Sequence, residues 1–172
     1  MMVKAILSVL VLVAAIQGQQ TNNQTPEQEH AAKMKRGDAG MGFSQDKTTH
    51  HFILCKDGGV IQVSANDPYD DASKDHIRMH LSNVAKMLSE GNFNIPMFVH
   101  DTTPPGVPTM ERLHNEIHYE YQPTEGGGKL LIETFNKAAV KAIHDFLRFQ
   151  ITEHQTGDPT QVVDGKRSRA NL

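Results

Sequence analysis

The chain has 172 residues, a formal net charge of -3 and a single cysteine, and this length suffices for one domain with its own hydrophobic core. The small net charge, with no basic stripe inside the domain, argues against a nucleic-acid partner. One cysteine excludes an intramolecular disulfide, and the lack of a C-x-x-C-H sequence excludes an ordinary covalently attached c-type haem.

The first 18 residues have the pattern of a secretory signal peptide. Lys4 precedes an apolar run from Ala5 to Ile16, which is too short to span a bilayer comfortably, and Gly18 offers a small residue for cleavage. An uncleaved N-terminal anchor is the alternative interpretation. Nothing later is apolar enough to cross a membrane, so we expect a periplasmic or secreted protein with no membrane insertion after cleavage.

Residues 19–36 predict a polar linker followed by a short helix, and residues 37–155 predict a single α+β domain. The short helix has Thr25 as its cap and Pro26 at its first position, and we expect the glycines that follow to end it. Residues 156–172 are polar and finish in a basic cluster, which predicts a disordered tail.

Within the domain, turn residues and apolar periodicity predict two strand–turn–strand–helix units. Each hairpin turn contains consecutive glycines, and each helix has one apolar stripe at helical spacing. An extended run and a proline-rich loop with a short helical turn connect the two units. The expected elements are strands at 51–55, 60–65, 117–122 and 129–135, the extended run at 95–100, the helical turn at 109–115, and helices from about 71 to 89 and from about 137 to 154.

The two units have the same order of elements, which indicates an internal repeat. Ile77 and Leu81 of the first helix correspond to Ile143 and Leu147 of the second. Neither unit has enough apolar surface to be stable alone, because a lone hairpin is marginal in water. We therefore predict an α+β fold in which two ββα repeats form one four-stranded antiparallel sheet, with the two main helices on one face.

The composition also points to metal chemistry, because the chain has ten histidines and eight methionines but no tryptophan. Histidine is the commonest metal ligand, and a thioether adds a preference for copper. His76 and His80 lie four residues apart on the first predicted helix, so both imidazoles face one side and could share an ion. The candidate metal ligands are His50, His51, His76, His80, His100, His144 and, as a soft ligand, Met41.

These histidines differ in where the predicted elements place them. His50 and His51 enter the first strand, where alternation sends the two side chains to opposite faces. We predict that His80 lies close enough to at least one of His50, His51 and His100 for one copper or zinc ion to bridge them. His154 ends the second helix, where an imidazolium interacts favourably with the helix dipole, and we interpret it as a capping residue.

Two arginines offer an alternative function. Arg78 and Arg148 occupy comparable turns of the two helices, where they could bind an anion or pair with nearby carboxylates. A small enzyme would use His100 or His51 as a general base and these arginines to hold an anionic substrate. The H-E-x-x-H, G-x-S-x-G and Walker motifs are absent, so the sequence names no catalytic residue.

Residues 41–52 read M-G-F-S-Q-D-K-T-T-H-H-F. In this motif the chain resembles a group of short exported bacterial proteins with M-G-F-x4-T-T-H-H-F near the mature N-terminus, and the likeness extends over about residues 36–158. Some members of that group are labelled aspartate carbamoyltransferase, but the S-T-R-T-R-type phosphate loop of those enzymes has no counterpart in this chain. The resemblance implies a single family domain without supplying a mechanism. The residues that it highlights are His50, His51, His80, His100 and His144.

The sequence thus supports three functional hypotheses, in order of preference. The first is an exported metal-binding domain for metal handling or sensing, with copper ahead of zinc and non-covalent haem third. The second is the small periplasmic enzyme described above. The third is a structural or protein-interaction domain in which the histidines bind nothing.

Overall fold

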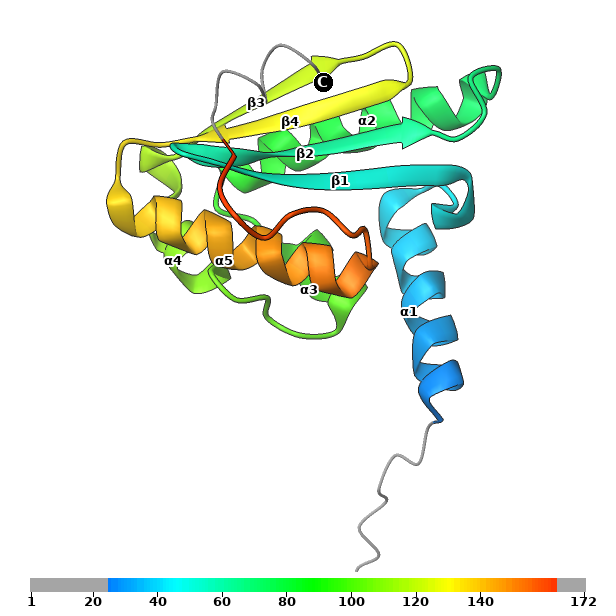
Figure 1. The fold of residues 1–172 in the computed structure, drawn as a ribbon, viewed down its shortest axis with the longest axis horizontal. Coiled ribbons are helices and arrows are strands. Elements are labelled where there is room, and N and C mark those ends of the chain that lie inside the picture. The colour runs from blue at the N-terminus through cyan, green and yellow to red at the C-terminus, as the bar shows by residue number, and fades with distance from the viewer. Residues whose placement is uncertain (1–24, 164–172) are drawn as a thin grey trace, which may run out of the picture.

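The computed structural model describes residues 25–163 (Figure 1). The expected signal peptide, the linker up to residue 24, and residues 164–172 of the tail lie outside this range. The helices of the described chain are α1 (Pro26–Met41), α2 (Asp71–Ser89), α3 (Asn94–His100), α4 (Val107–Arg112) and α5 (Lys137–His154), with short 3-10 helices at Gln45–Lys47 and His114–Glu116.

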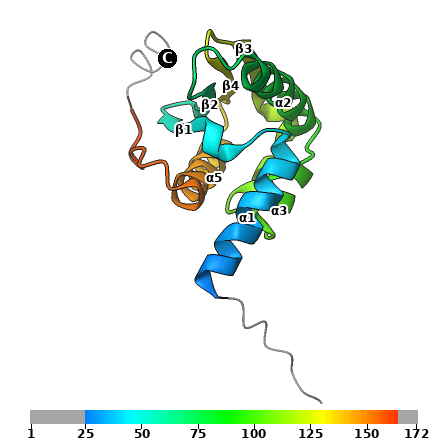
Figure 2. The same ribbon diagram turned by 90° about the vertical axis from the view of Figure 1, so that its right-hand side faces the viewer.

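Four strands form one antiparallel sheet in the order β1-β2-β4-β3. The strands are β1 (Thr48–Cys55), β2 (Gly58–Ala65), β3 (His118–Pro123) and β4 (Gly127–Glu133). The tight turn between β1 and β2 uses Gly58, whose φ of 146° is accessible to glycine. Both main helices pack on one face of the sheet, which confirms the predicted fold of two ββα repeats (Figures 1 and 2).

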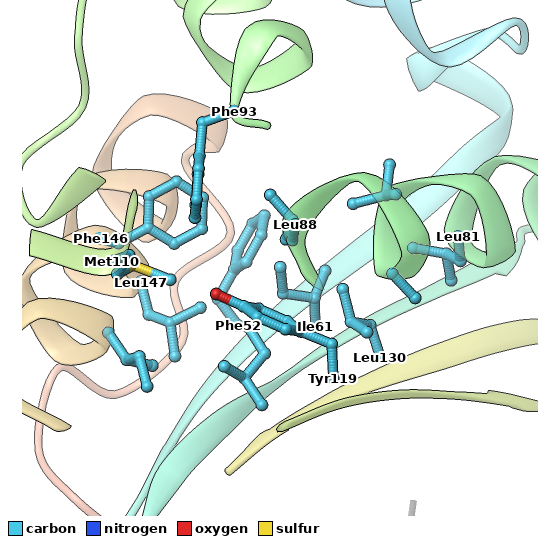
Figure 3. Close-up of a cluster of buried hydrophobic side chains, with 14 of the residues drawn as sticks. Phe52, Ile61, Leu81, Leu88, Phe93, Met110, Tyr119, Leu130, Phe146 and Leu147 are labelled. Carbon is cyan, nitrogen blue, oxygen red and sulfur yellow. The ribbon is translucent and has the colours of Figure 1, made fainter. Parts of the chain in front are cut away.

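The hydrophobic core lies between that sheet face and the helices (Figure 3). At its centre is a row across the sheet, in which Phe52 pairs with Ile61, Ile61 with Leu130, and Leu130 with Tyr121. The apolar stripes of α2 and α5 cover this row, as helical periodicity predicts. Full burial of each large apolar side chain stabilises the fold by about 1.5–3 kcal/mol, so this row and the stripes above it are its main support.

Each main helix packs over the hairpin of the other repeat. α2 lies mainly against β3 and β4, whereas α5 lies against β1 and β2. Glycines in the central strands allow the close approach: Leu81 packs on Gly128 and Leu147 packs on Gly59, where an added Cβ atom would collide. Because the helices are exchanged in this way, neither repeat supplies most of the cover for its own hairpin, and the two must fold as one unit.

α1 extends further than the sequence predicted. We expected the glycines after residue 35 to end it, but the helix continues through Gly37 and Gly40 and stops only at Gly42, which has a φ of 77°. A Cβ atom at Gly40 would lie 2.9 Å from the side chain of Val99 on α3. The internal glycines therefore serve the close packing of α1 on its neighbours, and this packing outweighs their low helix propensity.

The segment between the repeats is helical rather than extended. We expected residues 95–100 to be an extended run, but α3 forms there. Pro96 is tolerated because it lies in the first turn, where backbone N–H groups have no partner within the helix. α3 packs beside α1 (Figure 2), and the two form an outer layer over the end of the sheet where β1 begins.

The described end of the tail lies along the edge of β1. We expected residues 156–172 to be disordered, but the carboxylate of Asp158 accepts a hydrogen bond from His51 Nδ1 at 2.9 Å. The backbone N–H of Val163 donates to the carbonyl of Leu54 at 2.9 Å. This segment satisfies part of the exposed edge of β1, which would otherwise present unpaired backbone groups.

Candidate functional site

A cavity of about 80 Å³ lies between α2, α3 and α5, above the sheet. Phe52, Ile61 and Val63 form its floor, and apolar side chains of α2 and α3 form much of its walls. No carboxylate of the described residues lines it. Four histidines do, one each from β1, α2, α3 and α5, together with a methionine at the end of α1. These are His50, His80, His100, His154 and Met41.

Three of the histidine rings form a chain of contacts, with His154 in the middle. His50 stacks on His154 with ring centres 5.3 Å apart and an interplanar angle of 20°. His154 in turn meets His100 edge to face at 5.2 Å and lies 5.3 Å from the ring of Phe52. α5 packs over β1 and β2, which places its last residue, His154, above β1. There His154 contacts both His50 of β1 and His100 of α3.

His80 reaches the same cavity beside Phe43. The ring of Phe43 lies edge-on to His80 with centres 5.5 Å apart, and it stacks near His50 at 6.1 Å. His80 precedes the buried Leu81 on α2, which places it at the margin of the apolar stripe. Met41 is 9% exposed and lines the cavity with these rings, so a thioether and neutral imidazoles share one enclosure.

Burial keeps two of these imidazoles neutral. Desolvation is the main cause that lowers the pKa of His50 from 6.5 to about 4, and the charges of His80 and His51 lower it further. Desolvation likewise lowers the pKa of His80 to about 4. Neutral imidazole is the form that coordinates a metal ion, so neither ring has to lose a proton before binding at neutral pH.

His100 is held in place by α5. Its side chain is 2% exposed, and its Nδ1 lies 3.7 Å from a carboxylate oxygen of Glu153. Its Nε2 donates to Gln150 Oε1 at 3.0 Å, and its ring packs edge to face on Phe149 with centres 5.0 Å apart. These contacts fix the ring of His100 and, through it, the position of His154.

The donor atoms do not form a metal site as they stand. Within residues 25–163, no group of three or more His, Cys, Asp or Glu side chains is arranged to hold an ion. Two imidazoles on one tetrahedral ion have ring centres roughly 5 Å apart, and the His50–His154 and His154–His100 separations are of this size. Rotation of side chains between rotamers is therefore the rearrangement that a bound ion would require.

Three candidate ligands lie outside the cavity. His51 points to the opposite face of the sheet, where it donates to Asp158, and His76 is exposed on α2. His144 is buried, and its Nε2 donates to two backbone carbonyls of the β1–β2 turn at 2.8 and 3.1 Å. The candidate ligands that the structure does bring together are His50, His80, His100 and Met41.

Both candidate anion-binding arginines donate hydrogen bonds to backbone carbonyls. Arg78 donates from its guanidinium to the carbonyls of Gly127 at 3.3 Å and Thr124 at 3.1 Å. Arg148 donates to the carbonyl of Thr160 at 3.0 Å. Neither arginine lines the cavity, so the described chain does not join an arginine and a cavity histidine in one anion site.

His154 is the cavity residue that the sequence analysis did not select. We interpreted it as a capping residue because it ends α5. It lies seven residues after Leu147 and three after Ile151, so it continues the apolar stripe of α5. That spacing is the signal that could have placed it on the core-facing side of the helix.

No family model, curated protein or solved structure matches the chain. Among the described residues, no helix has the length and apolar character needed to cross a membrane. The case for a function therefore depends on the cavity and its side chains.

Proposed function

We propose that the chain is an exported protein whose cavity binds one metal ion, copper in preference to zinc, for metal handling or sensing. Support comes from the convergence of His50, His80 and His154 with Met41 in a single apolar cavity. These side chains come from four different elements, so the cavity exists only in the folded chain. Export is supported by the signal-peptide pattern of the first 18 residues.

The side chains have different roles in this proposal. His50 and His154 form the centre of the site because their rings are already in contact. His80 and Met41 complete the set of ligands from the side of α1 and α2. His100 positions His154, because both of its ring nitrogens already face groups on α5 and such outer contacts orient metal ligands.

The charge of the cavity favours Cu(I) over Zn(II). Imidazole and thioether carry no charge as ligands, and no carboxylate of the described residues lines the cavity. A zinc ion would bring a net charge of about +2 into apolar surroundings, where charge is costly unless it is compensated. Cu(I) brings half that charge, and it accepts imidazole and thioether ligands in low coordination numbers.

Metal titration of the purified mature protein tests the proposal. We expect one Cu(I) per chain in competition with a chromophoric chelator, with a Kd well below about 1 µM, equivalent to about -8.2 kcal/mol, and weaker binding of Zn(II). His118→Ala is a matched control, because His118 is 68% exposed on β3 and lies away from the cavity. Binding of neither ion more tightly than micromolar would contradict the proposal.

A further inference from the structure

A surface groove adjoins the cavity on the side of α1 and α2. It has a volume of about 470 Å³ and runs between the end of α1 and the outer face of α2. Met41 and His80 line both the groove and the cavity. The groove therefore leads from solvent to two of the proposed metal ligands.

Methionine is the residue that distinguishes this groove. Met79 and Met87 of α2 line it together with Met41, and Asn83 lies midway between them on the same helix. Met79 is 61% exposed, so it contributes little to the core. Met79 faces solvent on α2, where a polar side chain would be equally stable.

Charged groups in the groove do not favour a divalent ion. Lys86 and Glu90 both line it, and their opposite charges leave no net charge there. Besides His80 and Asn83, the remaining side-chain donors of the groove are the thioether sulfurs of its three methionines, which select Cu(I) over hard ions such as Mg(II). The chemistry of the groove thus matches the ion that the cavity favours, and the two sites share Met41 and His80.

Building on the proposed copper site, we propose that Met79, Met87 and Met41 form the entry route by which Cu(I) reaches the cavity. An ion first binds the outer thioethers of Met79 and Met87. It then moves by ligand exchange, in which a bond to an outer sulfur breaks as a bond to Met41 or His80 forms. Copper stays in the +1 state throughout, so the transfer needs no oxidant, reductant or proton acceptor.

The rate of loading tests this route separately from the affinity of the cavity. Cu(I) is presented as its complex with bicinchoninate, and loss of the chelator's colour is followed by stopped flow. The test variant carries Met79→Leu and Met87→Leu, because Leu replaces Met with little change in volume. Met97→Leu is the control, since Met97 lies on α3 outside both the groove and the cavity.

We expect the double variant to load at least tenfold more slowly than the wild type, while its equilibrium Kd changes less than twofold. The Met97→Leu variant should load at the wild-type rate. Equal loading rates in the double variant and the wild type would overturn the entry route and leave the cavity site standing. A wild-type protein that binds Cu(I) no more tightly than micromolar would overturn the cavity site and the route together.

Discussion

His50 on β1 and Tyr119 on β3 occupy equivalent positions in the two repeats. Ile61 of β2 pairs with Leu130 of β4 at the centre of the sheet. On the outer strands, Ile61 pairs with Phe52 and Leu130 pairs with Tyr121. His50 and Tyr119 each lie two residues before these partners. Tyr119 is packed in the core (Figure 3), where burial raises the pKa of its hydroxyl. His50 instead opens onto the cavity.

The helices provide further pairs of the same kind. Leu81 and Leu147 pack on equivalent glycines of the central strands, which aligns α2 with α5. Along the aligned helices, two more cavity histidines have apolar counterparts in the other repeat. The pairs are His80 with Phe146 and His154 with Leu88.

The comparison separates residues needed for the fold from residues available for function. At three positions one repeat has histidine where the other has Tyr, Phe or Leu, so the shared architecture does not require an imidazole there. Burying a polar ring in place of an apolar one costs stability, and this cost supports a functional reason for the histidines. His144 gives the opposite result, because its counterpart Arg78 also donates to the carbonyls of a hairpin turn.

The largest expected effect concerns the exchange of helices between the repeats. Leu147→Ala and Leu81→Ala each truncate a buried side chain, and each should lower the free energy of unfolding by about 3 kcal/mol. Both variants should unfold in one transition, because each helix covers the hairpin of the other repeat. Urea denaturation followed by circular dichroism and by tyrosine fluorescence measures this, and transitions that do not coincide would contradict it.

The next prediction imposes the pattern of one repeat on the other. A variant with His80→Phe and His154→Leu places the counterpart residues in the cavity, and its affinity for Cu(I) should fall at least 100-fold, or about 2.7 kcal/mol. Its thermal stability should stay the same or rise, since two apolar side chains replace imidazoles. His76→Ala, on the exposed side of α2, should bind Cu(I) like the wild type. Equal affinities in the two variants would remove the cavity from consideration.

Acid should destabilise the metal-free protein over a defined range of pH. Between pH 6.5 and about 4, an unfolded histidine binds a proton that His50 and His80 do not bind in the fold. The free energy of unfolding therefore falls as the pH is lowered through this window, by on the order of 3 kcal/mol for each residue. Urea titrations at about pH 7, 5.5 and 4.5 measure the decrease, which should be smaller in His80→Phe. A decrease of equal size in His80→Phe would refute this cause.

Much of the fold follows from local patterns in the sequence. Strand alternation directs His50 to the helix side and His51 to the other face. The side chain of Asn136 accepts hydrogen bonds from the backbone at the start of α5, the usual role of Asn at a helix N-terminus. The errors lie where tertiary contacts outweigh local preference. Gly40 sits inside α1 because that helix packs closely on α3, and Asp158 holds a tail whose composition predicts disorder.

The cavity could be predicted only in part, for a related reason. Helical periodicity places His80 at the edge of the apolar stripe of α2, and strand alternation places His50 on the core side of β1. Each could therefore be identified as a candidate from the local pattern of its own helix or strand. The contact between His50 and His154 depends on α5 crossing over β1. Since the order of elements along the chain is the same whether or not the helices are exchanged, only the packed fold shows that these two rings meet.

The smallest expected effect separates His144 from the cavity histidines. Its Nε2 donates to the carbonyls of Cys55 at 2.8 Å and Gly58 at 3.1 Å, so His144→Ala would leave both without this donor. We expect the free energy of unfolding to fall by about 1–2 kcal/mol, with faster hydrogen exchange in the β1–β2 turn. Arg78→Ala should have a smaller effect on the β3–β4 turn, because the side chain of Arg78 is 36% exposed and water can replace it.

Affinity for Cu(I) should not change in His144→Ala, because this ring faces the hairpin turn and does not line the cavity. His144→Gln retains an N–H donor of similar reach, so it should recover part of the lost stability. A His144→Ala protein that folds normally but binds Cu(I) at least tenfold more weakly would show that His144 belongs to the metal site. The correspondence between His144 and Arg78 as supports of the two turns would then be incorrect.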